Sequence, residues 1–168
     1  MKAKKIVRYR IPVSRVFPAT HPRKGENTHF AWKIITATEG TVDGLYMGKK
    51  LHTIRANYPL WAKRFEKINR GEAILELYYW TGKPYNSKTE TIIQLRKEDG
   101  IGIQRLEFYE DKDEIPALRY PLVNNFAEPD IEVIAKNDGL SIEDFKSWFK
   151  GYDLSNPLAI IHFTKFRY

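Results

Sequence analysis

The sequence predicts a mixed α+β fold in a single domain spanning residues 1–168, and three observations support this prediction. The length is that of one domain, and a hydrophobic fraction of 42% with 14% aromatic residues is enough for a sizeable core. Strand-like runs occur at 73–80, 88–96 and 101–109. The segment 57–71 has apolar residues at helical spacing. Strands and helices therefore share one chain of single-domain size.

The first half begins with a strand and a long loop. Residues 5–10 alternate apolar and basic positions, as in a half-buried strand. The segment 17–30 is rich in proline, glycine and polar residues, which indicates a surface loop. A short helix is expected over 30–37, followed by glycines and then by the strand-like segment 52–55.

The most clearly predicted helix of the first half lies between Asn57 and Gly71. Asn57 is a good N-cap, proline stands in the first turn, and glycine follows the end. Its apolar stripe consists of Trp61, Phe65 and Ile68. Because aromatic residues dominate protein interiors, Trp61 is assigned to the core rather than to base stacking.

The second half is predicted to contain three strands and a loop. The strand over 73–80 is followed by turn residues and the strand over 88–96. The Glu98-Asp99-Gly100 tripeptide predicts a hairpin between that strand and 101–109. Three prolines and an acidic cluster make 110–129 a loop, with a flap as one alternative.

The last part of the chain is predicted to hold two short helices and a buried strand. The first helix covers 130–138. Ser141 and Asp144 form a capping pair for the second helix, which ends at Gly151. The apolar run 158–163 is expected to be a buried strand.

Composition excludes several classes of function. Cysteine is absent, which removes disulfides, thiolate metal sites and cysteine nucleophiles. The four histidines lack the spacing of a metal site. No apolar run is long enough to cross a bilayer, and the N-terminal MKAKKIVRYRIP lacks the apolar core of a signal peptide. We therefore expect a soluble cytoplasmic protein with no metal, no cofactor and no membrane partner.

Charge is unevenly distributed along the chain. Residues 1–70 contain 16 Lys and Arg against 4 Asp and Glu, whereas residues 71–168 contain 12 against 17. A basic half rich in aromatic residues is suited to a polyanion, because phosphate neutralisation releases counterions and rings stack on bases. A solvated basic face is the alternative interpretation.

The most informative segment contains Lys50, Thr53 and Arg55. If 52–55 is extended, Thr53 and Arg55 point to the same face, and Lys50 lies at the start of the strand. The charge of Arg55 and partial burial would both lower the pKa of Lys50, so that its amine could act as a base toward the Thr53 hydroxyl. The alternative is an ordinary strand with solvated charges.

These residues also carry a resemblance to a known family. The string G-K-K-L-H-T-I-R at 48–55 resembles the G-x-K-x-x-T-I-R signature of the ASCH superfamily. Gly71-Glu72 opening a strand and Asn137-Asp138-Gly139-Leu140-Ser141 before a helix agree with its spacing. The resemblance covers most of 30–168, with 81–130 as an inserted loop and hairpin region. It implies a PUA-like mixed β-barrel with flanking helices.

Within that superfamily the chain is similar to bacterial N(4)-acetylcytidine amidohydrolases. The resemblance assigns catalytic roles to Lys50 and Thr53, and it places Asp138 where those enzymes have a glutamate. Arg55 is the signature arginine, and we expect Arg55 and His52 to bind substrate, although the family often has an apolar residue at the position of His52. Aspartate is one methylene shorter than glutamate, and an acidic residue before Gly-x-Ser also suits helix capping.

The implied chemistry needs no metal. Lys50 would take the proton of Thr53, whose oxygen would attack the acetyl carbonyl, while a carboxylic acid protonates the leaving amine. Arg55 would stabilise an oxyanion or bind a ribose or phosphate. These residues are expected to line a nucleobase-sized cleft.

Four further residues are candidates for substrate binding. Trp80 and Tyr85 border a Gly-Pro turn, where a ring can remain exposed for stacking. Arg23 and Lys24 lie in a basic loop that could reach a phosphate. The expected function is binding of a nucleoside or single-stranded RNA, with deacylation of N(4)-acetylcytidine-type nucleosides as the enzymatic form. The alternatives are a non-catalytic RNA-binding module and a protein that docks an acidic partner.

Overall fold

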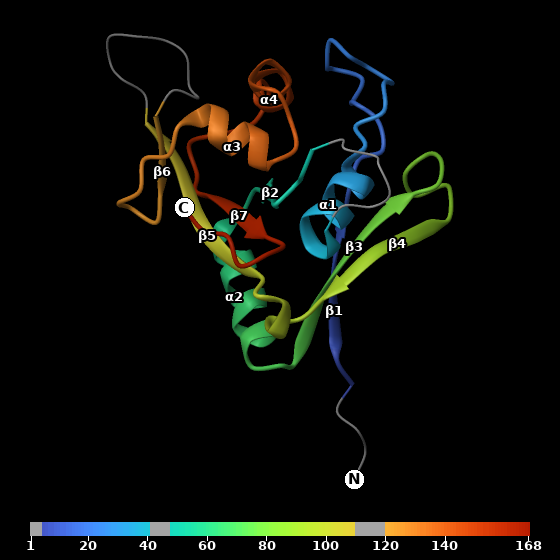
Figure 1. The fold of residues 1–168 in the computed structure, drawn as a ribbon, viewed down its shortest axis with the longest axis vertical. Coiled ribbons are helices and arrows are strands. Elements are labelled where there is room, and N and C mark those ends of the chain that lie inside the picture. The colour runs from blue at the N-terminus through green and yellow to red at the C-terminus, as the bar shows by residue number, and fades with distance from the viewer. Residues whose placement is uncertain (1–4, 41–47, 110–119) are drawn as a thin grey trace.

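The computed structural model describes residues 5–40, 48–109 and 120–168, which form an α+β fold (Figure 1). The strands are β1 Val7–Pro12, β2 His52–Arg55, β3 Ala73–Trp80, β4 Thr89–Leu95, β5 Gly102–Tyr109, β6 Tyr120–Val123 and β7 Leu158–His162. The helices are α1 Phe30–Glu39, α2 Tyr58–Asn69, α3 Ile131–Asn137 and α4 Ile142–Phe149. The mixed fold class is as the sequence predicts.

The strands form two separate sheets. The first has the order β1-β3-β4, with β1 parallel to β3 and β3 antiparallel to β4. The second has the order β2-β7-β5-β6 and is antiparallel throughout. No strand of the described segments belongs to both sheets, so the closed β-barrel that was expected is not present there. The region 81–130 supplies β4, β5 and β6, and thus contributes to both sheets.

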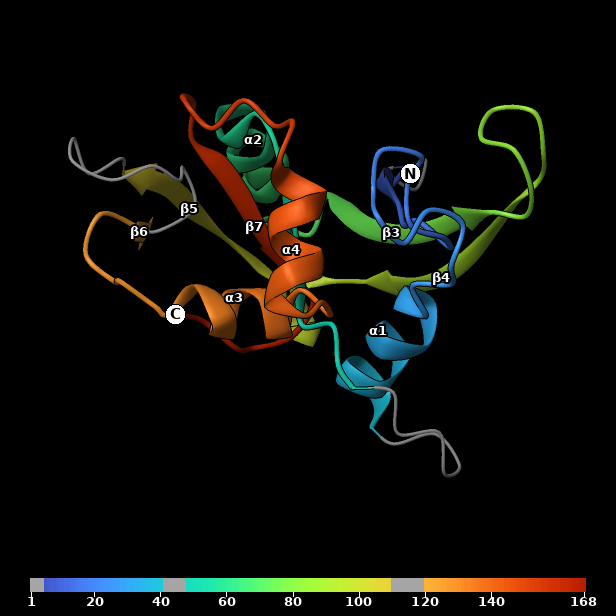
Figure 2. The same cartoon turned by 90° about the horizontal axis from the view of Figure 1, so that it is seen from above.

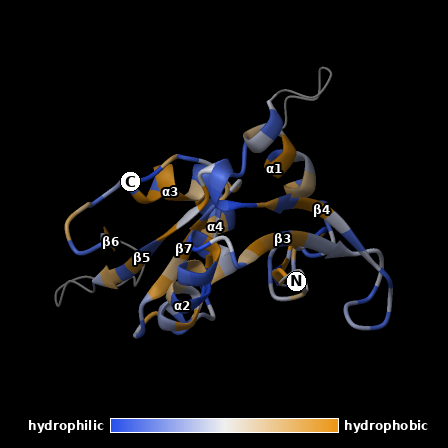
Figure 3. Cartoon of the chain, turned by 90° about the horizontal axis from the view of Figure 1, so that it is seen from below, coloured by the Kyte–Doolittle hydropathy of each residue, from blue (hydrophilic) through white to orange (hydrophobic). Residues whose placement is uncertain are grey.

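Helix α2 joins the two sheets. It contacts β3 in one sheet and β5 and β7 in the other (Figures 1 and 2). Its stripe of Trp61, Phe65 and Ile68 is buried, as expected for the core face of an amphipathic helix. One hydrophobic cluster contains residues from both sheets, including Leu75 of β3 and Ile160 of β7. In Figure 3 the loop between β3 and β4 is hydrophilic, in contrast to the strands.

Side-chain caps begin three of the helices. Asn57 accepts a hydrogen bond from the backbone N–H of Leu60, and Ser141 accepts one from that of Asp144. Asp130 does the same for Glu132 at the start of α3. The predicted capping residues of α2 and α4 are therefore confirmed, because each satisfies one of the N–H groups that a first helical turn leaves unpaired.

A buried carboxylate stabilises the three-stranded sheet. Glu76 of β3 accepts hydrogen bonds from Arg10 Nε of β1 at 2.5 Å, Thr91 Oγ1 at 3.1 Å and Gln94 Nε2 of β4 at 2.9 Å. The bonds from Gln94 and Arg10 lower the pKa of Glu76, which keeps it ionised. A single side chain thus connects all three strands.

Two local predictions are wrong. Glu98-Asp99-Gly100 does not connect a hairpin, because β4 pairs with β3 whereas β5 pairs with β6 and β7. A short 3₁₀ helix over Lys97–Asp99 carries the chain from one sheet to the other. The predicted loop 110–129 contains strand β6, which pairs with β5. Residues 110–119, where a flap was considered, lie outside the described residues.

Candidate active site

Four of the residues singled out from the sequence line one small pocket. Lys50, Thr53, Arg55 and Asp138 contribute to its wall, together with the rings of Phe30, Trp148 and Phe149. The cavity volume is about 30 Å³, which admits water-sized groups, whereas ligand pockets commonly have about 300–1,000 Å³. In this structure the pocket is therefore smaller than the nucleobase-sized cleft that was expected.

Local structure explains how these side chains meet. Thr53 and Arg55 are alternate residues of β2 and reach the same side of the strand. Asp138 directly follows α3, and Gly139 turns the chain there with a φ of 80°. A Cβ at Gly139 would lie 3.1 Å from Lys50 Cβ, so glycine permits the close approach of the two segments.

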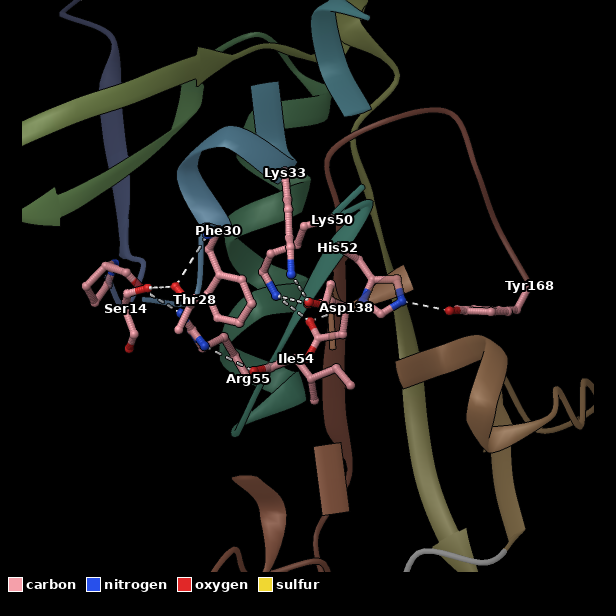
Figure 4. A network of polar contacts seen from close by, with 12 residues as sticks. Ser14, Thr28, Phe30, Lys33, Lys50, His52, Ile54, Arg55, Asp138 and Tyr168 are labelled. Atoms are coloured by element: carbon pink, nitrogen blue, oxygen red, sulfur yellow. Dashed lines mark hydrogen bonds and ion pairs between the residues drawn. The ribbon is translucent and has the colours of Figure 1, made fainter. Parts of the chain in front are cut away.

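Lys50 and Asp138 form a buried ion pair (Figure 4). Lys50 Nζ lies 2.7 Å from Asp138 Oδ1, and both side chains are almost fully buried, with exposed fractions of 3% and 6%. Burial lowers the pKa of Lys50, although the Asp138 charge acts against it. Burial acts to raise the pKa of Asp138, but Lys50 and His52 outweigh it and hold that pKa below its ordinary value.

Two lysine amines also bind carbonyl groups at the end of α3. Lys50 Nζ donates to the Asp138 backbone oxygen at 2.6 Å, and Lys33 Nζ donates to that of Gly139 at 2.7 Å. Carbonyl groups at a helix C-terminus lack intrahelical partners, so cations there are stabilising. The Phe30 ring lies under the Lys50 amine, with Nζ 4.2 Å from the ring centroid. Lys50 therefore has a structural role as well as a place in the pocket.

Thr53 and Arg55 differ in the hydrogen bonds that their side chains form. Thr53 is buried and forms no side-chain hydrogen bond with any of the described residues, so its hydroxyl is available to a ligand. Arg55 is half-buried and donates to the backbone oxygens of Pro12 at 2.7 Å and Ile54 at 3.2 Å. The remaining guanidinium N–H groups of Arg55 can still bind a carbonyl or phosphate oxygen.

His52 lies behind the ion pair instead of on the pocket wall. Its side chain is fully buried, its Nδ1 is 3.6 Å from Asp138 Oδ1, and its Nε2 is 2.7 Å from the Tyr168 hydroxyl (Figure 4). Burial lowers the pKa of His52, so the ring is held neutral. His52 therefore does not line the small pocket and contacts Asp138 and Tyr168 instead.

The other candidate binding residues lie elsewhere. Trp80 and Tyr85 contact each other at the tip of the β3–β4 hairpin, with ring centroids 5.2 Å apart, and Tyr85 is 86% exposed. Arg23 pairs with Asp144 and lines a neighbouring pocket, whereas Lys24 is exposed and lines neither of these two pockets. None of these four residues contributes to the wall of the small pocket.

Three contributors were missed in the sequence. Tyr168 and Phe30 contact the Lys50–Asp138–His52 group from distant segments, and Lys33 binds the Gly139 carbonyl next to Asp138. Phe30 and Lys33 were expected only as parts of a short helix, and Tyr168 carried no motif. Their roles depend on tertiary packing, for which the sequence contains no local signal.

Within the described segments, no helix is both long and apolar enough to cross a bilayer, and no cluster of three His, Asp or Glu residues could hold a metal ion. Comparison of the chain with protein-family models, with curated proteins and with solved structures finds no match.

Proposed function

We propose that the chain is an amidohydrolase that removes the acyl group from N(4)-acetylcytidine-type nucleosides, on a variant of the PUA-like architecture. One observation carries this proposal: a buried Lys50–Asp138 pair faces a pocket that also holds the unengaged hydroxyl of Thr53. The resemblance of 48–55 to the ASCH signature supports the choice of substrate.

A buried ion pair adds little to the net stability of a fold. Removing two charges from water costs about as much as their attraction returns, and apolar replacements are often as stable. Perturbed titratable groups beside a nucleophilic side chain are in contrast characteristic of active sites. The pair therefore fits a catalytic role better than a purely structural one.

The proton inventory of the reaction balances with these residues. Transfer of one proton from Lys50 Nζ to Asp138 Oδ1, along their hydrogen bond, gives a neutral amine and a carboxylic acid. The amine then takes the Thr53 proton as Oγ1 bonds to the acyl carbon, and Asp138 protonates the nucleobase nitrogen as the C–N bond breaks. Water cleaves the acyl-threonine, giving its proton to Asp138 while Lys50 returns one to Thr53.

Nucleoside binding requires the pocket to widen. Of the large side chains on its wall, Arg55 and Trp148 are half-buried while the others are buried, so these two have room to move. Arg55 then meets the oxygen of the acyl group or of the sugar, where its planar donors bind a developing oxyanion.

The decisive experiment measures acetate release from N(4)-acetylcytidine by purified variants. Lys50→Arg keeps the charge but cannot accept a proton, so kcat should fall by about 10³-fold or more with little change in nucleoside binding. Thr53→Val should act alike, and the double variant should be no worse than either single one, because base and nucleophile act as a unit.

The control is Lys63→Arg, on the exposed face of α2, which should retain the wild-type rate. Circular dichroism of each variant checks that the fold is retained. Near-normal turnover by folded Lys50→Arg would refute the general-base role.

A second function is favoured by a different feature, the ring pair at the hairpin tip. Exposed Tyr85 and half-buried Trp80, with Lys83 and Lys88 in the same hairpin, form a platform on which single-stranded RNA could stack. Absence of acetate release, combined with RNA binding that is lost in Tyr85→Ala, would identify a non-catalytic RNA-binding module instead.

A further inference from the structure

A second and larger pocket lies against the back of the candidate active site. Its volume is about 510 Å³, within the range of ligand pockets. Its wall is formed by the loop before α1, the start of α1, the end of α3, the start of α4, and the residues Gly48, Lys49 and Leu51. We call it the basic pocket, defined by its lining side chains Arg23, Lys33, Lys49 and Lys136.

Positive charge in this pocket exceeds negative charge. Among the described residues that line it, four are lysine or arginine and one, Asp144, is a carboxylate. Asp144 Oδ2 is already bound to Arg23 Nη1 at 2.6 Å, and the Arg23 Nε is bound to Glu26 at 2.7 Å. Asp144 is therefore engaged by Arg23, and none of the three lysines forms an ion pair with a carboxylate of the described segments.

The three lysines differ in what they contact. Lys33 donates to a neutral acceptor, the Gly139 carbonyl, and burial together with the charge of Arg23 lowers the pKa of Lys33. Lys49 and Lys136 are exposed, and neither forms an ion pair or a side-chain hydrogen bond with a described residue. Three cations around one concavity repel one another unless an anion lies between them.

We infer that the basic pocket is a binding site for a phosphate-bearing ligand. A phosphate group carries the charge that would offset the lysines, and its several oxygens can accept bonds from more than one amine. The polar side chains of Asn27 and Ser141 on the same wall offer further partners for phosphate oxygens. The inference is independent of any reaction in the neighbouring pocket.

The test uses the intact protein at low salt, with inorganic phosphate, cytidine 5′-monophosphate and cytidine as probes in calorimetric titrations. Lys49→Gln/Lys136→Gln should weaken phosphate binding by about tenfold or more, because the change removes two cationic donors to the phosphate oxygens. Lys63→Gln/Lys67→Gln, which removes the same charge from α2 outside the pocket, should leave binding unchanged.

The outcomes separate the ligand sources. If both probes bind and cytidine 5′-monophosphate binds more tightly than inorganic phosphate, the natural ligand of the pocket is a nucleotide. If the nucleotide does not bind more tightly, the ligand is a free oxyanion. Equal losses in the two double variants would show that only overall charge matters and would overturn the proposal, as would absence of phosphate binding at low salt. Acetate release is measured separately, so its failure does not affect this result.

Discussion

At the scale of single residues, the contact between His52 and Tyr168 decides which ring nitrogen of His52 carries the proton. The Tyr168 hydroxyl accepts a hydrogen bond from Asn137 Nδ2 at 3.1 Å. Burial raises the pKa of Tyr168, so the hydroxyl keeps its own proton; because Asn137 donates to its oxygen, we expect this proton to be donated to His52 Nε2. The histidine proton is then on Nδ1, which faces Asp138 Oδ1.

We therefore expect Tyr168→Phe to change the tautomer of His52. Without the hydroxyl donor, His52 Nε2 can carry the proton. His52 Nδ1 then has no N–H to direct toward the carboxylate of Asp138. Nitrogen-15 NMR of the His52 ring should show Nδ1 protonated in the wild type and a mixture of tautomers in the variant. Tyr109→Phe, at an exposed tyrosine, is the control. A wild-type ring protonated at Nε2 would contradict the assignment.

The sequence predicted part of this residue-level arrangement. Strand alternation brought Thr53 and Arg55 to one side of β2, and the family resemblance pointed to Lys50 and Asp138, which meet in the pocket. The contact of His52 with Tyr168 was not predictable, because it joins residues 116 positions apart. The catalytic roles of these residues stay predictions.

At the scale of elements, the start of α2 depends on the backbone conformation of its cap as well as on a hydrogen bond. Asn57 has a φ of 64°, in the left-handed region, and its side chain accepts from Leu60 N at 3.2 Å. Asparagine tolerates this conformation better than most residues with a Cβ. Because α2 contacts both sheets, its first turn matters for the whole core.

Asn57→Ala should reduce the free energy of unfolding by about 2 kcal/mol, since it loses the cap and places alanine at positive φ. Asn57→Gly removes the same side chain but tolerates the conformation, so its cost should be a few tenths of a kcal/mol. Urea denaturation measures both values. Equal losses of unfolding free energy in Asn57→Ala and Asn57→Gly would show that the left-handed conformation at residue 57 does not affect stability.

Turn chemistry at residues 98–100 was interpreted correctly as a turn but wrongly as a hairpin. Gly100 has a φ of 80° and Asp99 Oδ2 accepts from Arg96 N, so the chain does reverse locally. Which strands then pair is decided by long-range hydrogen bonds, and β5 finds its partners in β6 and β7. Short turn signals specify the bend and not the partner strand.

At the scale of the whole molecule, buried histidines make stability depend on pH. His162 is fully buried in β7, where its Nε2 bonds to Gln104 Oε1 at 2.9 Å. Burial lowers the pKa of His162 to about 2 from 6.5. Below pH 6.5 His162 therefore binds a proton in the unfolded chain but stays neutral in the folded protein. The free energy of unfolding consequently falls as pH falls toward about 2.

His162→Gln, which retains a donor for Gln104, should remove this contribution. One histidine changes the free energy of unfolding by about 1.4 kcal/mol for each pH unit when fully coupled. Urea denaturation between pH 7.5 and 4.5 should therefore show a slope shallower by up to that amount in the variant. The slope from His52 remains, because its pKa is also lowered. An unchanged slope would mean that His162 takes up a proton in the folded state.

The central position of β7 has a consequence during synthesis on the ribosome. β2 and β5 both pair with β7, yet β7 follows them in the chain by about 100 and 50 residues respectively. Until Leu158–His162 emerges, both strands present unpaired edges and apolar side chains, features that promote aggregation. For a long interval of synthesis, Thr53 therefore lies on a strand that has no β7 to pair with. During that interval a chaperone can bind the exposed apolar side chains of β2 and β5.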